Sequence, residues 1–441
     1  ADTLLADLAV DGGLYVPELW PVLPAVRRGM TYADAAATVM APFVEGEIDD
    51  ADLAAMCADA YASFRHPAVC PLVQIGPDDW LLELFHGPTL AFKDVALQLV
   101  GRLFDRVLGD RAEHVTIVGA TSGDTGSAAI DAVAGRAHVD IVILYPEGRV
   151  SDVQRRQMTT VDAPNVRTVA IEGTFDDCQD LVKAMFADEA FRADQRLAAV
   201  NSINWARVMA QVVYYVTATL HLGGPVAFAV PTGNFGNVLS GWVARRMGAP
   251  VERLVIGSNR NDILARFLHS GIMATSTVVP TLSPSMDIQV SSNFERLLFE
   301  LNHRDGGMTA EQLQHFRATG SLVVEPDQLE AVTATFDAAR VDDEATLAMI
   351  ADTYRRTGIL VDPHTAVGLG AAAVCRPPEG VPMVTLATAH PAKFPDAVEQ
   401  ATGVRPDLPP HLADLWDRPE RATTLPNDLA KLEAFVVGSG G

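Results

Sequence analysis

The strongest constraint on the fold is a regular alternation of short apolar runs and helix-like segments that begins near residue 114. The apolar runs HVTIVGA, HVDIVILY and NVRTVAIEG are rich in Val and Ile, and the segments SAAIDAVAG and FDDCQDLVKAMFAD separate them. Short β-branched runs are typical of buried strands. Parallel strands need a crossover, usually a helix, between them. The pattern therefore predicts an α/β fold in which helices cover both faces of a parallel sheet.

The alternation returns after residue 204. We expect a long apolar helix over 205–221, the strand PVAFAV, the loop PTGNFGN, a helix over 238–248, and the later strands RLVIGS and MVTLAT. A chain of 441 residues is too long for one ordinary core. We therefore predict two open, mostly parallel sheets flanked by helices. The predicted units are an N-terminal helical extension over 1–74 packed on the large domain, a large domain of 75–104 and 205–441, and a small mobile domain over 105–204.

Composition excludes several classes of function. A formal net charge of -23 disfavours nucleic acid and anionic membranes as partners, although a small anion can still bind where local donors gather. The stretch from Val208 to Ala244 has no charged residue, but Gly223, Gly224 and Pro225 divide it, which favours a buried helix and strand over a membrane span. The four cysteines form no C-x-x-C pair, so we expect no metal site. No basic and then apolar leader opens the sequence, and we expect a cytoplasmic protein.

Two glycine-rich loops share one design, in which a buried strand runs into small residues that open a helix. They are GATSGDTGS at 119–127 and PTGNFGN at 231–237. Such a loop turns backbone N–H groups and the positive end of a helix dipole toward an oxyanion, although either loop alone is also a plain tight connection. Neither has the Walker or the dinucleotide-binding spacing. Two such loops at neighbouring strand ends suggest a ligand with two anionic ends, or two anionic ligands side by side.

A third segment, ELFHGPTLAFKDVALQ, places Lys93 among apolar residues at the start of an expected helix. Burial disfavours the charged form of a lysine, which is what a Schiff-base lysine needs. The spacing alone equally allows a lysine that extends from the helix end and pairs with an acid.

Six motifs decide between the two interpretations of Lys93, a Schiff-base lysine and a lysine that pairs with an acid. HGPTLAFKD, TSGDTG, NSINWARV, PTGNFGN, SPSMDIQVSSNFERLLF and TAHPAKF occur in the order and approximate spacing of threonine synthases of the longer bacterial and fungal type, and DGGLYVP is similar to the N-terminal region of that family. The chain thus resembles this family from residue 11 to about residue 400. The resemblance implies pyridoxal-phosphate (PLP) fold type II, similar to the tryptophan synthase β subunit.

The resemblance also assigns roles to residues. It implies that Lys93 bonds to the cofactor, that Asp124 lies near the O3' atom of PLP, and that Thr388 meets the pyridine nitrogen and leaves it largely unprotonated. The cofactor phosphate is expected on the loop of Gly233, Asn234, Phe235, Gly236 and Asn237. The substrate carboxylate is expected at Thr121, Ser122 and Thr125, and the substrate phosphate at Asn201, Ser202, Asn204 and Arg207.

Several of these residues have a structural alternative. Asn201 or Ser202 can simply cap a helix, and Arg207 can form a surface ion pair. Asn293 and Arg296 either line the site or cap and pair on the helix that follows. His364 and His390 are not assigned a catalytic role, because a lone His near a helix start is more often structural.

The resemblance implies the conversion of O-phospho-L-homoserine and water to L-threonine and phosphate, a step of threonine biosynthesis. Two other activities remain open. A phospholyase or an amino-acid dehydratase would share the fold and the cofactor loops. A non-catalytic relative would bind only a small anion or a partner protein. We expect a monomer or a homodimer.

Overall fold

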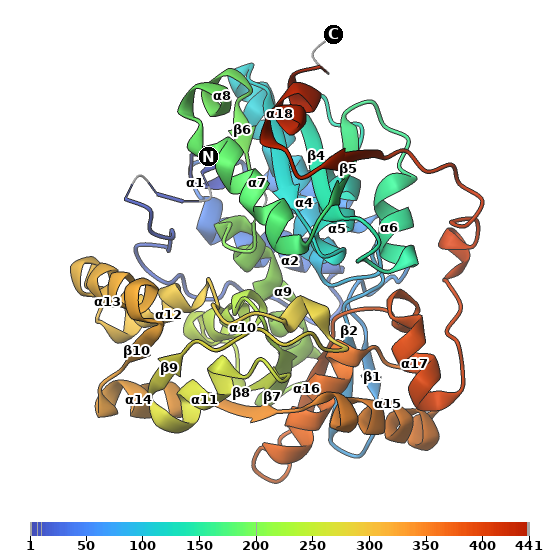
Figure 1. The fold of residues 1–441 in the computed structure, drawn as a ribbon. Helices are drawn as coiled ribbons and strands as arrows, with labels where there is room; N and C mark the ends of the chain where they lie inside the picture. Colours follow the sequence, from blue (N-terminus) through green and yellow to red (C-terminus); the bar gives the residue numbers. More distant parts are fainter. Residues whose placement is uncertain (1, 7, 10, 200, 439–441) are drawn as a thin grey trace.

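The structure is a computed structural model that describes residues 2–6, 8–9, 11–199 and 201–438. Two open sheets lie at opposite ends of the molecule in Figure 1, each with its own covering helices. This confirms the predicted α/β architecture with two mostly parallel sheets.

The small sheet has five parallel strands in the order β13-β5-β4-β3-β6. Its strands are β3 (Val115–Ala120), β4 (Val139–Pro146), β5 (Val166–Glu172), β6 (Leu197–Ala198) and β13 (Thr423–Pro426). The helices of this part are α5 (Asp124–Val133), α6 (Asp152–Thr159), α7 (Phe175–Ala187), α8 (Glu189–Asp194) and α18 (Leu429–Val437).

The large sheet has six strands in the order β1-β2-β12-β7-β8-β11. They are β1 (Leu72–Gln74), β2 (Asp79–Glu83), β7 (Val226–Pro231), β8 (Val251–Ser258), β11 (Phe336–Arg340) and β12 (Met383–Ala387). Only the β1–β2 pair is antiparallel.

Both faces of the large sheet are buried. Along β7, Phe228 and Val230 belong to a core shared with α9 (Trp205–Leu222) and α10 (Gly236–Met247), whereas Ala227 and Ala229 belong to a separate cluster with α16 (Pro363–Val374). Alternate side chains of a strand point to opposite faces, so helices cover the two faces separately. The uncharged stretch after Val208 is thus a buried helix and strand, as expected. Across the part of the chain that is described, no helix has both the length and the apolar character needed to cross a bilayer.

Helices account for most of the remaining chain. The N-terminal part contains α1 (Asp2–Leu5), α2 (Tyr32–Val44) and α3 (Asp50–Tyr61). Beside the large sheet lie α11 (Ile263–Ser270), α12 (Phe294–Leu301), α13 (Gly306–Thr319), α14 (Pro326–Thr333), α15 (Asp343–Thr357) and α17 (Pro395–Thr402). Short 3-10 turns η1 (Pro284–Met286), η2 (Pro391–Lys393) and η3 (Pro410–Leu412) and a small antiparallel pair, β9 (Ile272–Ala274) with β10 (Ser321–Val323), complete the fold.

One long helix, α4 (Lys93–Arg111), connects the two parts. It begins beside the large sheet and packs along α5 of the small part. The two helices approach closely at Gly101, where a Cβ atom would lie 2.4 Å from the carbonyl oxygen of Ala132. The glycine therefore fixes the separation between the start of α4 and the start of α5.

The predicted division into domains differs from the structure at the C-terminus. Residues 205–441 were all expected in the large domain, but β13 pairs in parallel with β5, and α18 packs on α7. The red end of the ribbon in Figure 1 runs from α17 back to the small sheet. The strand β13, with the sequence TTLP, is short and half exposed. It lacks the long apolar run that marks strands such as β3 and β4 in the sequence.

Candidate active site

Lys93 is held at the junction of two backbone segments. The N–H of Phe92 donates to the carbonyl of Thr388 over 2.8 Å, and the N–H of His390 donates to the carbonyl of Leu90 over 3.0 Å. Leu90 adopts a left-handed conformation, with φ 65°, that turns the chain into α4. These contacts anchor the start of α4 on the loop that follows β12, and they bring Thr388 next to the Lys93 segment.

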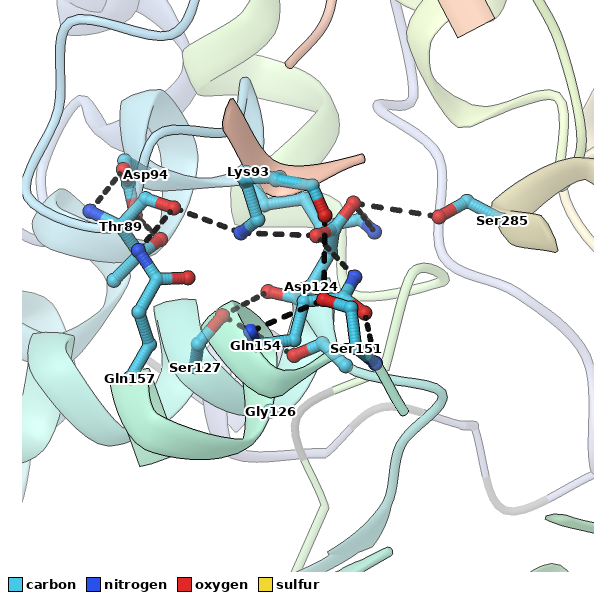
Figure 2. Close-up of polar contacts among 12 residues, drawn as sticks. Thr89, Lys93, Asp94, Asp124, Gly126, Ser127, Ser151, Gln154, Gln157 and Ser285 are labelled. Carbon is cyan, nitrogen blue, oxygen red and sulfur yellow. Dashed lines mark hydrogen bonds and ion pairs between the residues drawn. The ribbon is translucent and has the colours of Figure 1, made fainter. Parts of the chain in front are cut away.

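The amine of Lys93 lies in a buried polar cluster (Figure 2). Lys93 is 8% exposed, and its Nζ is 3.5 Å from Oδ2 of Asp124. Burial lowers the pKa of Lys93, while the negative charge of Asp124 opposes that shift. The lysine is therefore not a surface group that extends into water, and its burial weakens its hold on a proton.

Asp124 is the centre of this cluster. It begins α5, is 4% exposed, and accepts a hydrogen bond of 2.9 Å from Nε2 of Gln154. Ser285 Oγ donates to its Oδ2 over 3.4 Å, and Nζ of Lys393 is 2.9 Å from its Oδ1. Burial acts to raise the pKa of Asp124, but the charges of Lys393 and Lys93 overcome it and hold that pKa well below its usual range. Asp124 is therefore a carboxylate.

Sequence analysis missed Lys393, Gln154 and Ser285. Two of them fall in motifs already noted, since Lys393 is the lysine of TAHPAKF and Ser285 belongs to SPSMDIQVSSNFERLLF. One signal was available for Lys393, because it follows Pro391 and Ala392 and precedes Phe394, surroundings as apolar as those of Lys93. Gln154 had no such signal, because it resembles any polar residue in the first turn of a helix.

The loop of Thr121 is shaped by its own side chain. Thr121 Oγ1 accepts from the N–H groups of Gly123 and Gly126, both at 2.9 Å. Gly123, with φ 132°, has a backbone conformation that L side chains rarely adopt. The hydroxyl of Thr121 thus stabilises the turn and keeps only its O–H for a ligand, while Ser122 and Thr125 lie half-buried on the same loop.

The loop of Gly233 to Asn237 ends in a helix start. Phe235 is left-handed, with φ 64°, and α10 begins at Gly236, so the first N–H groups of the helix face out of its N-terminus. Oδ1 of Asn237 accepts from the hydroxyls of Tyr214 and Tyr215, at 2.5 and 2.9 Å. Its Nδ2 is buried and has no protein acceptor among the described residues. A buried donor of this kind fits an anion at the loop.

Ser285 links this loop to the lysine. Its hydroxyl contacts Asp124, and a Cβ atom at Gly233 would lie 2.9 Å from its carbonyl oxygen. The N–H of Ser285 donates to Nε2 of His364 over 3.2 Å, and His364 Nδ1 is 2.7 Å from Oδ2 of Asp362. His364 therefore supports Ser285. Lys93, Asp124 and the 233–237 loop surround one site.

Asn293 and Arg296 join the two loops on which phosphates were expected. Asn293 Nδ2 donates to the carbonyls of Ser202 and Asn234, both at 3.0 Å, and Arg296 donates to the carbonyls of Ile203 and Tyr15, at 2.6 and 2.8 Å. Asn293 also accepts from Arg296. Asn293 makes no side-chain cap bond to α12, so only the pairing with Arg296 is observed from that alternative, and both side chains hold the backbone of the 201–204 and 233–237 segments.

The polar residues of the NSINWAR segment differ in burial and in the contacts that they make. Asn204 is the N-cap of α9, where its side chain accepts from the N–H of Ala206 at 3.0 Å and donates to the carbonyl of Leu4 at 2.8 Å. Asn201 is exposed and Ser202 half-buried. Arg207 is 4% exposed, and its charge contributes to the lowered pKa of Lys93. The alternative of a surface ion pair for Arg207 is therefore wrong.

His390 caps the turn η2, where its Nδ1 accepts from the N–H of Ala392 at 3.2 Å. Burial lowers its pKa to about 4. His390 is therefore a neutral ring that caps a turn.

The residues present fit PLP. A buried amine with a lowered pKa suits an aldehyde, and a helix start with an unsatisfied buried amide donor suits a phosphate. The loop also approaches Ser285 closely at Gly233, where a Cβ atom would lie 2.9 Å from the carbonyl oxygen of Ser285 and has no room. Thr388, 5% exposed, offers a hydroxyl at the end of β12.

Comparison with known proteins gives three family matches along the chain. "Threonine synthase N terminus" matches residues 1–61, "Pyridoxal-phosphate dependent enzyme" matches 72–326, and "Threonine synthase, C-terminal" matches 365–436.

Relatives and solved structures match over nearly the whole chain. A threonine synthase from Pseudomonas aeruginosa is 56% identical over 447 residues, which cover 100% of this chain and 95% of that protein. The crystal structure of PLP-bound threonine synthase from Brucella melitensis is 51% identical with a TM-score of 0.97 and covers 99% of this chain and 96% of that one. The yeast enzyme structure is 39% identical with a TM-score of 0.94, over 99% of this chain and 95% of that one.

Proposed function

Because this chain belongs to the threonine synthase family of PLP-dependent enzymes, we propose that it converts O-phospho-L-homoserine and water to L-threonine and phosphate. The observation that carries the proposal is the buried amine of Lys93, 3.5 Å from a carboxylate that also contacts the wall of the 233–237 loop through Ser285. We expect the reaction in the cytoplasm.

The residues that would hold the cofactor are those of the two loops and α4. Lys93 would bond to the aldehyde, the helix start at Gly233, Asn234, Phe235, Gly236 and Asn237 would bind the phosphate, Asp124 would lie near O3', and Thr388 would meet the ring nitrogen. When bound, PLP supplies an electron sink that stabilises negative charge next to the amino carbon of the substrate.

The substrate is oriented by its two anionic ends. Thr121, Ser122 and Thr125 surround the carboxylate, with Thr121 acting mainly by shaping its turn. Asn201, Ser202, Asn204 and Arg207 form the phosphate side, where Arg207 is the cation and Asn204 fixes the helix start. In a chain of net charge -23, a buried arginine is what makes a phosphorylated substrate acceptable at this position.

Proton transfer is the work of Lys93. Its amine takes a proton from Cα of the substrate and moves protons at Cβ, and burial, which lowers its pKa, weakens its hold on those protons. Phosphate leaves from Cγ, and water adds at Cβ. Approach of the small part to the large part would exclude other water during these steps.

Replacing Lys93 with Ala tests the proposal. We expect Lys93→Ala to lose both the cofactor absorbance band and turnover, whereas Lys183→Ala, at an exposed lysine on α7, keeps both. The assay supplies O-phospho-L-homoserine and measures L-threonine, phosphate and 2-oxobutyrate. Full activity in Lys93→Ala would disprove the assignment, and 2-oxobutyrate in place of threonine would favour the phospholyase or dehydratase alternative.

A further inference from the structure

The chain contains only four lysines among its 33 basic residues, at positions 93, 183, 393 and 431. Lys183 and Lys431 are exposed. Lys93 and Lys393 are buried, and both approach the same carboxylate, that of Asp124. A protein that otherwise uses arginine has thus placed two of its four lysines at one buried acid.

Lys393 is the closer partner of that acid. Its side chain is fully buried, and its Nζ lies 2.9 Å from Oδ1 of Asp124, whereas Nζ of Lys93 lies 3.5 Å from Oδ2. Lys393 Nζ also donates to the carbonyl of Thr89 over 2.8 Å. The ion pair of Asp124 is therefore made chiefly with Lys393, and Lys93 makes the looser contact.

Lys393 also ties three segments together. Thr89, which it contacts, holds Asp94 through its N–H and its hydroxyl, at 2.9 and 2.5 Å, and so fixes the first turn of α4. The carbonyl of Lys393 accepts from Ser151 Oγ, the N-cap of α6, over 3.2 Å. One residue thus connects the turn before Lys93, the start of α5 and the start of α6.

A reaction at Lys93 creates a charge problem that Lys393 solves. When the Lys93 amine is bonded elsewhere, Asp124 loses a partner, and a buried carboxylate without a cation is strongly destabilising. Resting on the role of Lys93 proposed above, we propose that Lys393 is a positioning residue of the reaction. Its side chain holds Asp124 and the Thr89 turn through contacts that do not involve Lys93, so that Lys93 can bond to the cofactor and be released while Asp124 stays paired.

The same arrangement acts on Lys93 itself. The charged groups that act on Lys93 are Asp124 from α5, Lys393 from η2 and Arg207 from α9, while the neighbouring Asp94 is turned toward Thr89. Burial is the main cause that lowers the pKa of Lys93, and the charges of Lys393 and Arg207 lower it further against the opposing charge of Asp124. Loss of the Lys393 charge removes one lowering influence and frees Asp124 to pair fully with Lys93. Both changes raise the proton affinity of the Lys93 nitrogen.

The test compares the cofactor-loaded wild-type chain with Lys393→Met and Lys393→Arg. Two pH profiles are measured, the absorbance of the cofactor on Lys93 and kcat/KM for O-phospho-L-homoserine. We expect Lys393→Met to move the Lys93-dependent midpoint to higher pH by about one unit or more, about a tenfold rise in proton affinity. Lys393→Arg keeps the charge and should keep the midpoint. Lys183→Met is the matched control and should behave as the wild type.

If Lys393→Met does not fold, Lys393→Gln takes its place, because it can still donate to Asp124 and Thr89 but carries no charge. If the neutral variant has the wild-type midpoint in both pH profiles, the proposed role of Lys393 is wrong. The proposed function of the enzyme is then unaffected. Borohydride reduction followed by mass spectrometry separates the two questions. Cofactor fixed on Lys93 supports the proposed function, and cofactor fixed on another lysine would overturn both proposals.

Discussion

At the scale of single residues, Asn237 illustrates how the site prepares for an anion. The two tyrosine hydroxyls that occupy its Oδ1 determine the orientation of the amide, so its Nδ2 must point the other way. A buried donor without an acceptor costs about 1–3 kcal/mol. The fold accepts this cost where a phosphate would remove it.

Asn237→Asp replaces only the Nδ2 group, the donor without an acceptor. The aspartate can still accept from the hydroxyls of Tyr214 and Tyr215. We expect the affinity for PLP to fall by about tenfold or more, since a charge-assisted hydrogen bond of about 1.5–3 kcal/mol is replaced by repulsion. Equilibrium titration with PLP measures it. Asn234→Asp adds the same charge at the exposed position of the same loop and should cost less. Equal losses in the two variants would contradict the role of the Asn237 amide.

At the scale of elements, the site depends on how α4 and α5 pack. Each helix begins with a residue of the central ion cluster, Lys93 on α4 and Asp124 on α5. Gly101 lets α4 approach the backbone of α5 at Ala132. The distance between the Lys93 amine and the Asp124 carboxylate therefore depends on the helix contact at Gly101 and Ala132, two turns further along each helix.

Gly101→Ala should separate the two helices. A Cβ atom at this position meets the carbonyl oxygen of Ala132 at 2.4 Å, and backbone cannot move aside cheaply, so we expect a loss of about 1–3 kcal/mol in unfolding free energy. Chemical denaturation and PLP titration measure the effects on stability and on the site.

Gly109→Ala is the matched control on the same helix. Its Cβ would meet only the ring of His138, at 3.1 Å, a side chain that can move. Because Ala is the better helix former by up to about 1 kcal/mol, this variant should be neutral or more stable. A stability loss as large as that of Gly101→Ala would show that close helix packing is not the cause.

At the scale of the whole molecule, one core cluster reaches both sheets, since Ile141 of β4 and Phe228 of β7 belong to it, but the other face of the small sheet has a core of its own. A cluster with Val142, Val169 and Ile171 at its centre lies on one face of the small sheet, and α18 completes it with Leu432 and Val436. The last helix of the chain thus belongs to the core of the small sheet together with β13, although the preceding helices α15, α16 and α17 lie with the large part.

Leu432→Ala should loosen the small part selectively. Leu432 is fully buried, and truncating such a leucine costs about 2–5 kcal/mol. Hydrogen exchange should accelerate in β3, β4 and β5 and stay unchanged in the large sheet, because local opening follows the cooperative unit that is weakened. Val437→Ala, at a residue of the same helix that is 51% exposed, serves as the control. Equal acceleration in both sheets would mean that the two cores unfold as one.

The sequence by itself determined the fold class, the two glycine-rich loops, and the apolar surroundings of Lys93. These are local features, since strand and helix periodicity, glycine turns and apolar neighbours are all contained in short windows. The same short segments identified Arg207 but did not show whether it is buried. A charged residue in an expected helix does not tell which face of that helix is covered.

Only the tertiary structure decided which charges meet. Lys393 and Thr89 are 304 residues apart, and nothing in either segment indicates that the amine of one bonds to the carbonyl of the other. The return of β13 to the small sheet was equally hidden, since an edge strand of four residues has no periodicity of its own. Long-range pairing is set by how elements pack, and a one-dimensional pattern carries no record of which buried groups must neutralise each other.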